Sequence, residues 1–425
     1  MARICVVRCH LYQDSRVMRE VAALIEAGHE VVVLCERDVD EPRIERRESL
    51  TIYRLPLRHV AGAGALRLLA EYAAFFMLAA MLVTVSHLHR RFAVVQVNSV
   101  PDALVFVATV PRLTGARVLL DLQEPMPEFF MTKFGVGARH PLVGVVAAAE
   151  QLSIRFADAA ITVTEAMRRR FIERGAPPER VNVVMDGADE SVFDRERRLG
   201  EYVPSADRFV LISHGTIEPQ YGLDTVIEAI ALLAPEWPGL QLQIFGDGSQ
   251  RAQLRQLARV KGVGDRVWFS DGFVPIEELV SALASADVGV VAMRRDPFRD
   301  LTLAGKMFDF VAMGIPMIVG TTRSVEETFG EGCFEPFRSG DAHDLVTAIR
   351  RLRDEPERAR KYVERATEVV EGIAWRVQRR RYQALVADLV SGRQSGYAAR
   401  RPADWSWRTR WRGNGSDDGT TSSPT

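Results

Sequence analysis

Residues 209–248 read FVLISHGTIEPQYGLDTVIEAIALLAPEWPGLQLQIFGDG, and this stretch decides the fold class. It holds an apolar run at 209–213, a helix pattern at 223–233 and a second apolar run at 240–245. Short apolar runs between turn residues are typical of strands buried on both faces, and a helix between two of them indicates a parallel pair. The stretch therefore predicts a β-α-β unit in an α/β domain.

The same alternation extends from this unit to both sides. Further strands are expected at 4–7, 31–34, 94–97, 118–122, 160–163, 181–185, 267–269, 288–291 and 316–319. Further helices are expected at 17–27, 103–110, 142–156, 165–174, 249–259, 276–285, 303–313 and 342–354. Two consecutive blocks of this kind predict two doubly wound α/β domains that face each other across a cleft.

The composition of the 425 residues is that of an ordinary globular protein. Lys and Arg number 55 and Asp and Glu 56, so the net charge is −1, and the lack of a basic excess disfavours a general nucleic-acid binder. The apolar run at 4–7 is too short for a signal peptide, so we expect a cytosolic start. We interpret Cys5, Cys9, Cys35 and Cys333 as buried thiols in a reducing compartment. A metal site at Cys5 and Cys9 is the alternative, but no second pair of cysteines lies nearby in the sequence to complete it.

Two loops of the second block carry glycines just after predicted strands. Gly215 and Thr216 follow one strand and Gly222 opens the next helix, while Gly246 and Gly248 follow the neighbouring strand. Exposed amides at such a helix start favour an anion such as pyrophosphate, and the alternative is a set of simple tight turns. The third glycine of the dinucleotide fingerprint is missing, which disfavours a dehydrogenase.

Residues 300–316, DLTLAGKMFDFVAMGIP, form the more specific motif. Lys306 places a positive charge at the start of a predicted helix, where the helix dipole favours an anion, so a phosphate bound between them would explain it. Asp309 lies three residues on along the same face and could accept hydrogen bonds from ribose hydroxyls. The alternative is a solvated lysine–aspartate pair.

Together these segments resemble the family-4 glycosyltransferases, whose fold is GT-B, with two Rossmann-like domains. The resemblance covers about residues 3–390. In the second block it rests on Gly215 and Gly222, on FGDG at 245–248, on DGFV at 271–274 and on residues 306–316. In the first block it rests on Asp14, Arg16, Glu20 and Gly28, and on LDLQEPMPE at 120–128.

The resemblance implies a nucleotide-sugar donor on the second domain, an acceptor on the first, transfer with retention of configuration, and no required metal or other cofactor. It implies that the base is held by Gly272, Phe273 and Val274, the ribose by Asp309, and the pyrophosphate by the amides of Leu303, Ala304 and Gly305. On the acceptor side, polar residues that follow parallel strands are expected to line the opposite wall of the cleft, namely Asp14, Arg16, Glu20, Gln123, Glu124 and Glu128.

Four positions depart from the family pattern. The basic pair of the glycine loop is replaced by Thr216 and Tyr221, the first motif glutamate by Leu301, and the histidine of the first domain by Gln123. We expect Lys306 to supply the missing cation and Glu124 to be the acidic residue near the transferred sugar, with Gln123 orienting a hydroxyl. The alternatives are a non-catalytic member that binds a nucleotide sugar or partner enzyme, and a sugar-nucleotide epimerase.

The expected domain boundaries follow from the two blocks and the resemblance. The first domain is expected over 1–200 and the second over 201–374, with a charged, glycine-containing linker loop near 186–207. A helix at 375–392 is expected to cross back onto the first domain, as GT-B proteins do. Residues 393–425, rich in Arg, Gly, Ser and Thr, are expected to be a disordered tail.

Two apolar segments of the first domain point to a membrane surface. The stretch 65–85 is the most apolar of the chain but is interrupted by charges, so it is too short for a confident spanning helix. It could instead expose Phe75, Phe76 and Met77 to lipid, near Arg67, Arg90 and Arg91, while Phe129, Phe130 and Met131 lie in an expected loop beside Lys133. We expect peripheral binding to the cytosolic face of the membrane and a lipid-linked acceptor. The alternative is that both segments pack into the first domain.

Overall fold

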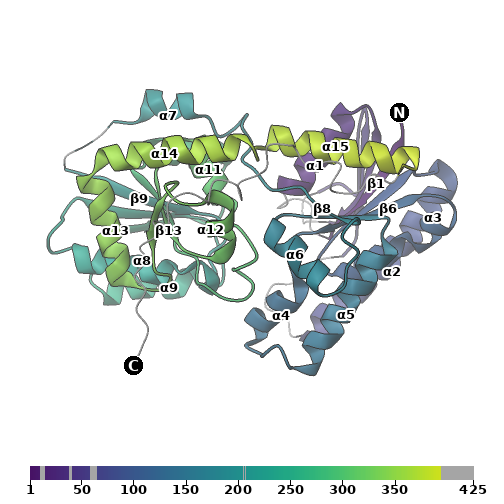
Figure 1. Ribbon diagram of the computed structural model, residues 1–425, viewed down its shortest axis with the longest axis horizontal. Helices are drawn as coiled ribbons and strands as arrows, with labels where there is room; N and C mark the ends of the chain where they lie inside the picture. Colours follow the sequence, from purple (N-terminus) through teal and green to yellow (C-terminus); the bar gives the residue numbers. More distant parts are fainter. Residues whose placement is uncertain (10–14, 38–40, 58–64, 204, 206, 394–425) are drawn as a thin grey trace, which may run out of the picture.

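The structure is a computed structural model that describes residues 1–9, 15–37, 41–57, 65–203, 205 and 207–393. Its strands form two separate sheets, each covered by helices, and Figure 1 shows the two resulting domains side by side. The predicted fold class, two doubly wound α/β domains, is therefore confirmed. Asp14 and nearly all of the predicted tail lie outside the described residues.

The first domain is built on an eight-stranded sheet in the order β3-β4-β2-β1-β5-β6-β7-β8. All neighbours are parallel except the edge pair β3 and β4. The strands are β1 (Arg3–Val7), β2 (Glu30–Glu36), β3 (Ile44–Arg47), β4 (Leu50–Leu55), β5 (Val94–Asn98), β6 (Arg117–Leu122), β7 (Ala159–Thr162) and β8 (Val181–Val183). Its helices are α1 (Ser15–Glu26), α2 (Ala65–Arg90), the 3₁₀ helix η1 (Asp102–Ala108), α3 (Thr109–Leu113), α4 (Met126–Phe134), α5 (Pro141–Phe156) and α6 (Glu165–Glu173).

The second domain has a six-stranded parallel sheet in the order β11-β10-β9-β12-β13-β14. The strands are β9 (Phe209–His214), β10 (Leu240–Phe245), β11 (Val267–Phe269), β12 (Val288–Val291), β13 (Met317–Gly320) and β14 (Glu335–Phe337). The helices are α7 (Arg195–Glu201), η2 (Pro219–Tyr221), α8 (Leu223–Leu233), α9 (Arg251–Val260), α10 (Ile276–Ser285), α11 (Lys306–Ala312), α12 (Arg323–Phe329), α13 (Ala342–Asp354) and α14 (Pro356–Glu371).

The strand order of each sheet reverses at one point, and this locates the region where a ligand binds. In the second sheet the reversal lies between β9 and β12, and in the first between β1 and β5. In open parallel sheets, ligands bind outside the carboxyl ends of the strands beside such a reversal. The loops that follow β9 and β12 are therefore the first place to look for a site in the second domain.

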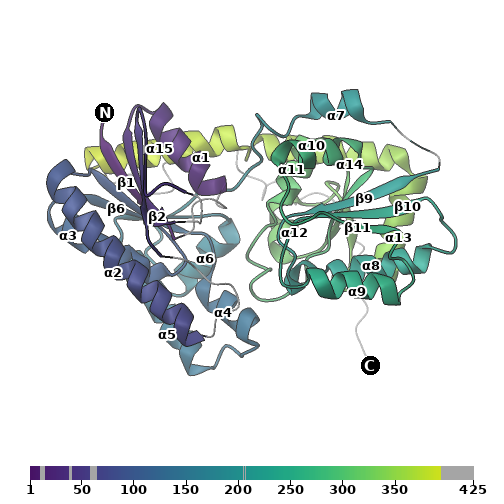
Figure 2. The same cartoon turned by 180° about the vertical axis from the view of Figure 1, so that it is seen from behind.

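A final helix, α15 (Trp375–Ser391), returns to the first domain. Figure 2 shows it continuing from the second domain along the first, next to α1. Its buried face, which carries Tyr382, Leu385, Val386 and Leu389, completes a core cluster with residues of β1 and β2 such as Ile4 and Val33. The first domain thus depends on the end of the folded chain for part of its core.

The expected linker loop contains a helix that the sequence analysis missed. Asp194 caps α7 by accepting a hydrogen bond from the amide of Glu196 at 2.9 Å. Arg198 on this helix is buried and donates to the carbonyl oxygen of Ala286 at 2.6 Å. Because α7 packs on α10, residues 195–201 lie with the second domain, which corrects the boundary expected at residue 200.

Two further expectations about the first domain are corrected. The helix expected at 103–110 is the 3₁₀ helix η1 followed by the short α3. Phe129, Phe130 and Met131, expected in a loop, lie in α4, which begins after Pro125 and ends at Gly135 in a left-handed conformation.

The long apolar helix α2 has one face in the core and one face toward solvent. Phe75, Ala79, Val83 and His87 recur every four residues and are buried, so Phe75 is not available to a membrane as one hypothesis required. Met77 is 67% and Met81 61% exposed. Among the described residues this helix is also the one stretch, 70–90, long and apolar enough to span a bilayer, with a mean hydropathy of 1.5.

Candidate functional site

The carboxyl end of β9 brings a histidine next to the predicted ribose-binding carboxylate. His214 is the last residue of β9, and its Nε2 lies 3.6 Å from Oδ2 of Asp309 on α11. Burial, and then the charge of Lys306, lower the pKa of His214 to about 3, so its ring is neutral at pH 7. Asp309 has its pKa raised to about 7 by burial, which outweighs the opposing effect of Arg19 and Lys306.

Lys306, the predicted pyrophosphate-binding residue, points at the loop that follows β9. Its Nζ lies 4.7 Å from the centroid of the Tyr221 ring, and a Cβ atom added to Gly215 would lie 3.9 Å from Nζ. The side chain is almost fully buried, and burial, followed by repulsion from Arg299, lowers its pKa to about 7. A lysine held in this way readily gains or loses its proton near neutrality.

The predicted donor-binding glycines are required by contacts within the chain. A Cβ atom on Gly246 would lie 1.9 Å from the carbonyl oxygen of Gly215, and one on Gly248 would lie 2.2 Å from that of Ile217. A Cβ atom on Gly222 would lie 2.1 Å from the carbonyl oxygen of Ala292. Their tight packing is explained without a ligand, so it does not test their predicted role.

The remaining predicted donor residues surround these loops. Gly272 forms an isolated bridge with Gly246, and Phe273 beside it is 61% exposed, so its ring is accessible. Leu303, Ala304 and Gly305 precede α11 instead of opening it, because the helix begins at Lys306. The exposed Thr216 and the partly buried Val274 complete the set. Their roles stay predictions.

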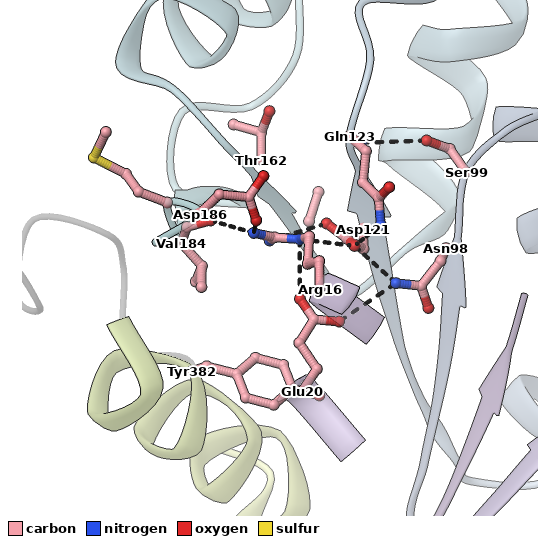
Figure 3. Close-up of polar contacts among 12 residues, drawn as sticks. Arg16, Glu20, Asn98, Ser99, Asp121, Gln123, Thr162, Val184, Asp186 and Tyr382 are labelled. Atoms are coloured by element: carbon pink, nitrogen blue, oxygen red, sulfur yellow. Dashed lines mark hydrogen bonds and ion pairs between the residues drawn. The ribbon is translucent and has the colours of Figure 1, made fainter. Parts of the chain in front are cut away.

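Gln123 and Glu124 follow β6 on the first domain. Nε2 of Gln123 donates to Oδ2 of Asp121 at 2.9 Å, and its backbone amide donates to the Ser99 hydroxyl at 3.3 Å (Figure 3). Burial raises the pKa of Glu124, although the positive charges of Arg299, Arg8 and Lys133 oppose this. Since Arg299 belongs to the second domain, Glu124 lies where the two domains meet.

Arg16 and Glu20 do not line an open wall, contrary to the prediction. Figure 3 shows Arg16 enclosed by carboxylates, with ion pairs to Glu20 at 3.2 Å, Asp121 at 3.3 Å and Asp186 at 3.0 Å. Glu20 is fully buried and also accepts a hydrogen bond from Gln96 at 2.7 Å. These residues hold β5, β6 and the segment after β8 together, because buried charges must be paired.

Glu128, also predicted on the acceptor side, is likewise a buried charge that is held by ion pairs within the first domain. Its carboxylate is buried and pairs with Arg170 and Arg174, each at 2.7 Å. Both arginines come from α6 or its end, so Glu128 fastens α4 to α6. Its carboxylate is thus occupied by these two ion pairs.

The loop between β12 and α11 (residues 292–305) joins the two domains near this site. Thr164 donates to the carbonyl oxygen of Leu301 at 2.6 Å, and Thr132 on α4 donates to Asp296 at 3.3 Å. The rings of Phe129 and Phe298 meet edge to face, with centroids 5.4 Å apart. We call this contact region the domain junction; it brings Glu124 of the first domain near Arg299 of the second.

Sequence reasoning missed Arg299, which lies in the same loop. The residue is 6% exposed and its guanidinium carbon lies 4.8 Å from the centroid of the Tyr221 ring. The one local signal was a lone arginine in the segment FRDL at 298–301, which does not reveal what it contacts. Across the described ranges, no group of three or more His, Cys, Asp or Glu side chains could hold a metal ion.

Comparisons with known proteins agree with the two-domain architecture. The family described as Glycosyl transferase 4-like domain matches residues 13–187, and the family described as Glycosyl transferases group 1 matches residues 208–355. Sucrose-phosphate synthase of Thermosynechococcus elongatus has a similar fold, with a TM-score of 0.74, 19% identity, and coverage of 92% of this chain and 100% of that one. Anabaena HepE, solved in complex with UDP and glucose, also has a similar fold, with a TM-score of 0.66 and 14% identity. The match covers 91% of this chain and 100% of that one.

Curated relatives align over part of their length. The chain is 29% identical to a GDP-mannose-dependent alpha-(1-6)-phosphatidylinositol monomannoside mannosyltransferase of Mycolicibacterium smegmatis over 57% of this chain and 64% of that protein. It is 28% identical to a D-inositol 3-phosphate glycosyltransferase of Thermomonospora curvata over 52% of this chain and 54% of that protein. The match thus spans less than two thirds of these relatives. The two family matches, one on each domain of a GT-B fold, establish that the chain belongs to the family-4 glycosyltransferases.

Proposed function

We propose that this protein transfers a sugar from a nucleotide-sugar donor to a glycan or lipid-linked acceptor, with retention of configuration and without a required metal. The observation that carries the proposal is that the buried Lys306 and the partly buried Asp309 lie beside Gly215 and His214 at the strand-order reversal of the second sheet. A lysine and a carboxylate at this place suit the pyrophosphate and ribose of one nucleotide.

Lys306 would act on the leaving group. When the bond between the anomeric carbon and the diphosphate oxygen breaks, that oxygen keeps the electron pair, and a nearby cation stabilises the growing negative charge. The acceptor hydroxyl oxygen bonds to the same carbon, and its proton passes by way of Glu124 to the released diphosphate. A protonated Lys306 supplies the positive charge that other enzymes obtain from a metal ion.

Glu124 would lie on the acceptor side of the transferred sugar. Its raised pKa and its place at the domain junction suit a group that contacts a hydroxyl and assists in proton transfer. Gln123 is fixed by Asp121 and Ser99, so its amide would orient a hydroxyl but would not take its proton.

A lipid-linked acceptor is supported by the outer face of α2. Met77, Met81, Val85 and Leu88 are exposed on this helix, and Arg90 and Arg91 lie at its end. The Mycolicibacterium smegmatis relative is named for transfer to a phosphatidylinositol monomannoside, which is a lipid. We therefore propose peripheral association with the cytosolic membrane surface through this face.

The test is to incubate the protein with a panel of UDP-, GDP-, ADP- and dTDP-sugars and to measure nucleotide release with and without membrane lipid extract. Acceptor-dependent release that survives EDTA and is lost in Lys306→Ala supports metal-free transfer, and the anomeric configuration of the product checks retention. Binding without release would instead identify a non-catalytic member. Epimerised donor without acceptor would identify an epimerase.

A further inference from the structure

Arg299 is a buried cation for which the described residues supply no ion pair, although its charge acts on Glu124. Its guanidinium carbon lies between two rings, 4.8 Å from the centroid of Tyr221 and 4.6 Å from that of Phe298. Its Nε has no hydrogen-bond partner among the described residues, and the hydroxyl of Thr302 lies 3.5 Å from Nη1. Burying an incompletely paired charge costs free energy, so a second role for this side chain is expected.

A second cation lies against the same aromatic ring. Lys306 Nζ is 4.7 Å from the Tyr221 centroid, so Tyr221 contacts both positive groups. An aromatic face attracts cations and thereby holds the two in place although they repel each other. Their repulsion contributes to the lowered pKa of Lys306. Two like charges that contact one ring, of which Lys306 also lies beside Gly215, form a site for a ligand with at least two negative charges.

We infer that Arg299, held on Tyr221 beside Lys306, binds the pyrophosphate of the nucleotide-sugar donor and supplies the charge that Thr216 and Tyr221 do not provide. This inference rests on the proposed function. Tyr221 thus carries no charge of its own but positions two cations, Arg299 from the β12–α11 loop and Lys306 from α11. The family pattern has its basic residues in the loop after β9, whereas in this chain the charge comes from the loop after β12 and from α11.

The competing explanation is that Arg299 has a purely structural role at the domain junction. Phe298 beside it contacts Phe129, and Arg299 is the cation that most strongly opposes the raised pKa of Glu124. A structural arginine would affect stability and domain contact, whereas a pyrophosphate-binding arginine affects affinity for diphosphates more than for monophosphates. The two explanations therefore differ in a measurable way.

The experiment is calorimetric titration of the full chain with UDP, GDP and ADP and with the matching monophosphates. For the diphosphate that the wild type binds, Arg299→Gln is expected to lower affinity at least tenfold, with a smaller loss for the monophosphate. Arg295→Gln is the control: Arg295 lies in the same loop but is half exposed and paired with Asp300, and its loss should leave affinity unchanged. Circular dichroism monitors folding.

A sharper test moves the positive charge from position 299 to position 216. Thr216 is exposed at the position where the family carries a basic residue, so Thr216→Arg in the Arg299→Gln background should recover most of the diphosphate affinity. If Arg299→Gln does not fold, Arg299→Lys is measured instead, and a diphosphate affinity within about threefold of wild type would support a charge-based role.

Two results would overturn the inference. Wild-type diphosphate affinity in Arg299→Gln, together with lost affinity in Lys306→Ala, would overturn it while the proposed function stands. Equal losses of diphosphate and monophosphate affinity in a folded Arg299→Gln, with no gain from Thr216→Arg, would also overturn it. If the wild type binds none of the three diphosphates, the result contradicts the proposed function itself, and the inference about Arg299 is rejected with it.

Discussion

The hydroxyl of Tyr382 on α15 donates a hydrogen bond of 2.5 Å to Oε1 of Gln96 on β5. Gln96 in turn donates to Glu20, which pairs with Arg16. The C-terminal helix is therefore bonded directly to the buried charge network of the first domain. All four of these side chains are buried, so each depends on its partners in place of water.

Tyr382→Phe should destabilise the protein by about 1–3 kcal/mol, because it leaves a buried amide oxygen without its donor. Chemical denaturation followed by circular dichroism measures the change. Arg376→Gln on the same helix removes an exposed ion pair with Glu190 and should change stability by less than about 0.5 kcal/mol. Equal stability of Tyr382→Phe and wild type would contradict a structural role for this bond.

Lys306→Ala should weaken nucleotide-sugar binding by about 1.5–3 kcal/mol, as expected for loss of a buried charge-assisted contact. Asp309→Asn should act in the same direction through the ribose, and calorimetry measures both. Lys261→Ala is a matched control, since Lys261 pairs with Glu228 on the surface. Unchanged affinity in both site variants would refute the donor assignment.

Donor affinity should fall as pH rises through about 7. The pKa of Lys306 in the free protein is lowered to about 7, chiefly by burial. A bound pyrophosphate favours the protonated amine and raises this pKa again, so binding takes up a proton above pH 7 and linkage lowers the affinity there. Calorimetry in buffers of different ionisation enthalpy should detect this uptake with an intact nucleotide sugar, whose diphosphate does not titrate in this range.

The uptake should be lost in Lys306→Met, because ribose hydroxyls that donate to Asp309 favour its ionised form, so this group, whose pKa burial raises to about 7, takes up no proton on binding. Proton release on binding, or uptake that is identical in Lys306→Met, would show that Lys306 does not contact the pyrophosphate.

Two neighbouring glutamates of the first domain should respond differently to the same substitution. Glu124→Gln should reduce the transfer rate about a hundredfold while donor affinity is kept, as for loss of a general acid–base group. Glu128→Gln should mainly lower stability, by at least about 1 kcal/mol, because Arg170 and Arg174 lose a buried partner. Full transfer activity in Glu124→Gln would remove it from the mechanism.

Flotation with anionic liposomes tests the exposed face of α2. The wild type should float at low salt and less at high salt, since Arg90 and Arg91 near anionic lipid add about 1 kcal/mol each. Substitution of both Met77 and Met81 by Glu should abolish flotation and keep the fold, because both side chains point away from the core. Wild-type protein that stays at the bottom of the gradient at low salt would contradict membrane binding.

Hydrophobic patterning predicted most of the buried strands, because each is a continuous apolar run such as 31–34. It did not predict the edge pair β3 and β4, since Ile44–Arg47 is mostly charged and one face lies in solvent. The pattern also placed η1 as an α-helix, because apolar spacing alone does not distinguish a 3₁₀ helix from an α-helix.

In the candidate site, too, local sequence patterns were predictable and contacts between distant segments were not. Lys306 and Asp309 could be predicted because their spacing within one helix is local. The contact of Arg299 with Tyr221 could not, since it joins loops after two different strands. The burial of Glu20 and Glu128 was also missed. Glu20 pairs with Arg16 four residues away on α1, but the contact with Gln96 that encloses it joins distant parts of the chain. The partners of Glu128, Arg170 and Arg174, lie 42 and 46 residues further along the chain.

The return of α15 to the first domain has a consequence for synthesis on the ribosome. The side chains of Tyr382, Leu385, Val386 and Leu389 become available to the core around Ile4 only after the whole second domain has been translated. The nascent first domain must therefore wait with an apolar surface uncovered, a state in which chains aggregate or recruit chaperones. A chain that stops before residue 375 should emerge as an aggregation-prone fragment and not as an independent domain.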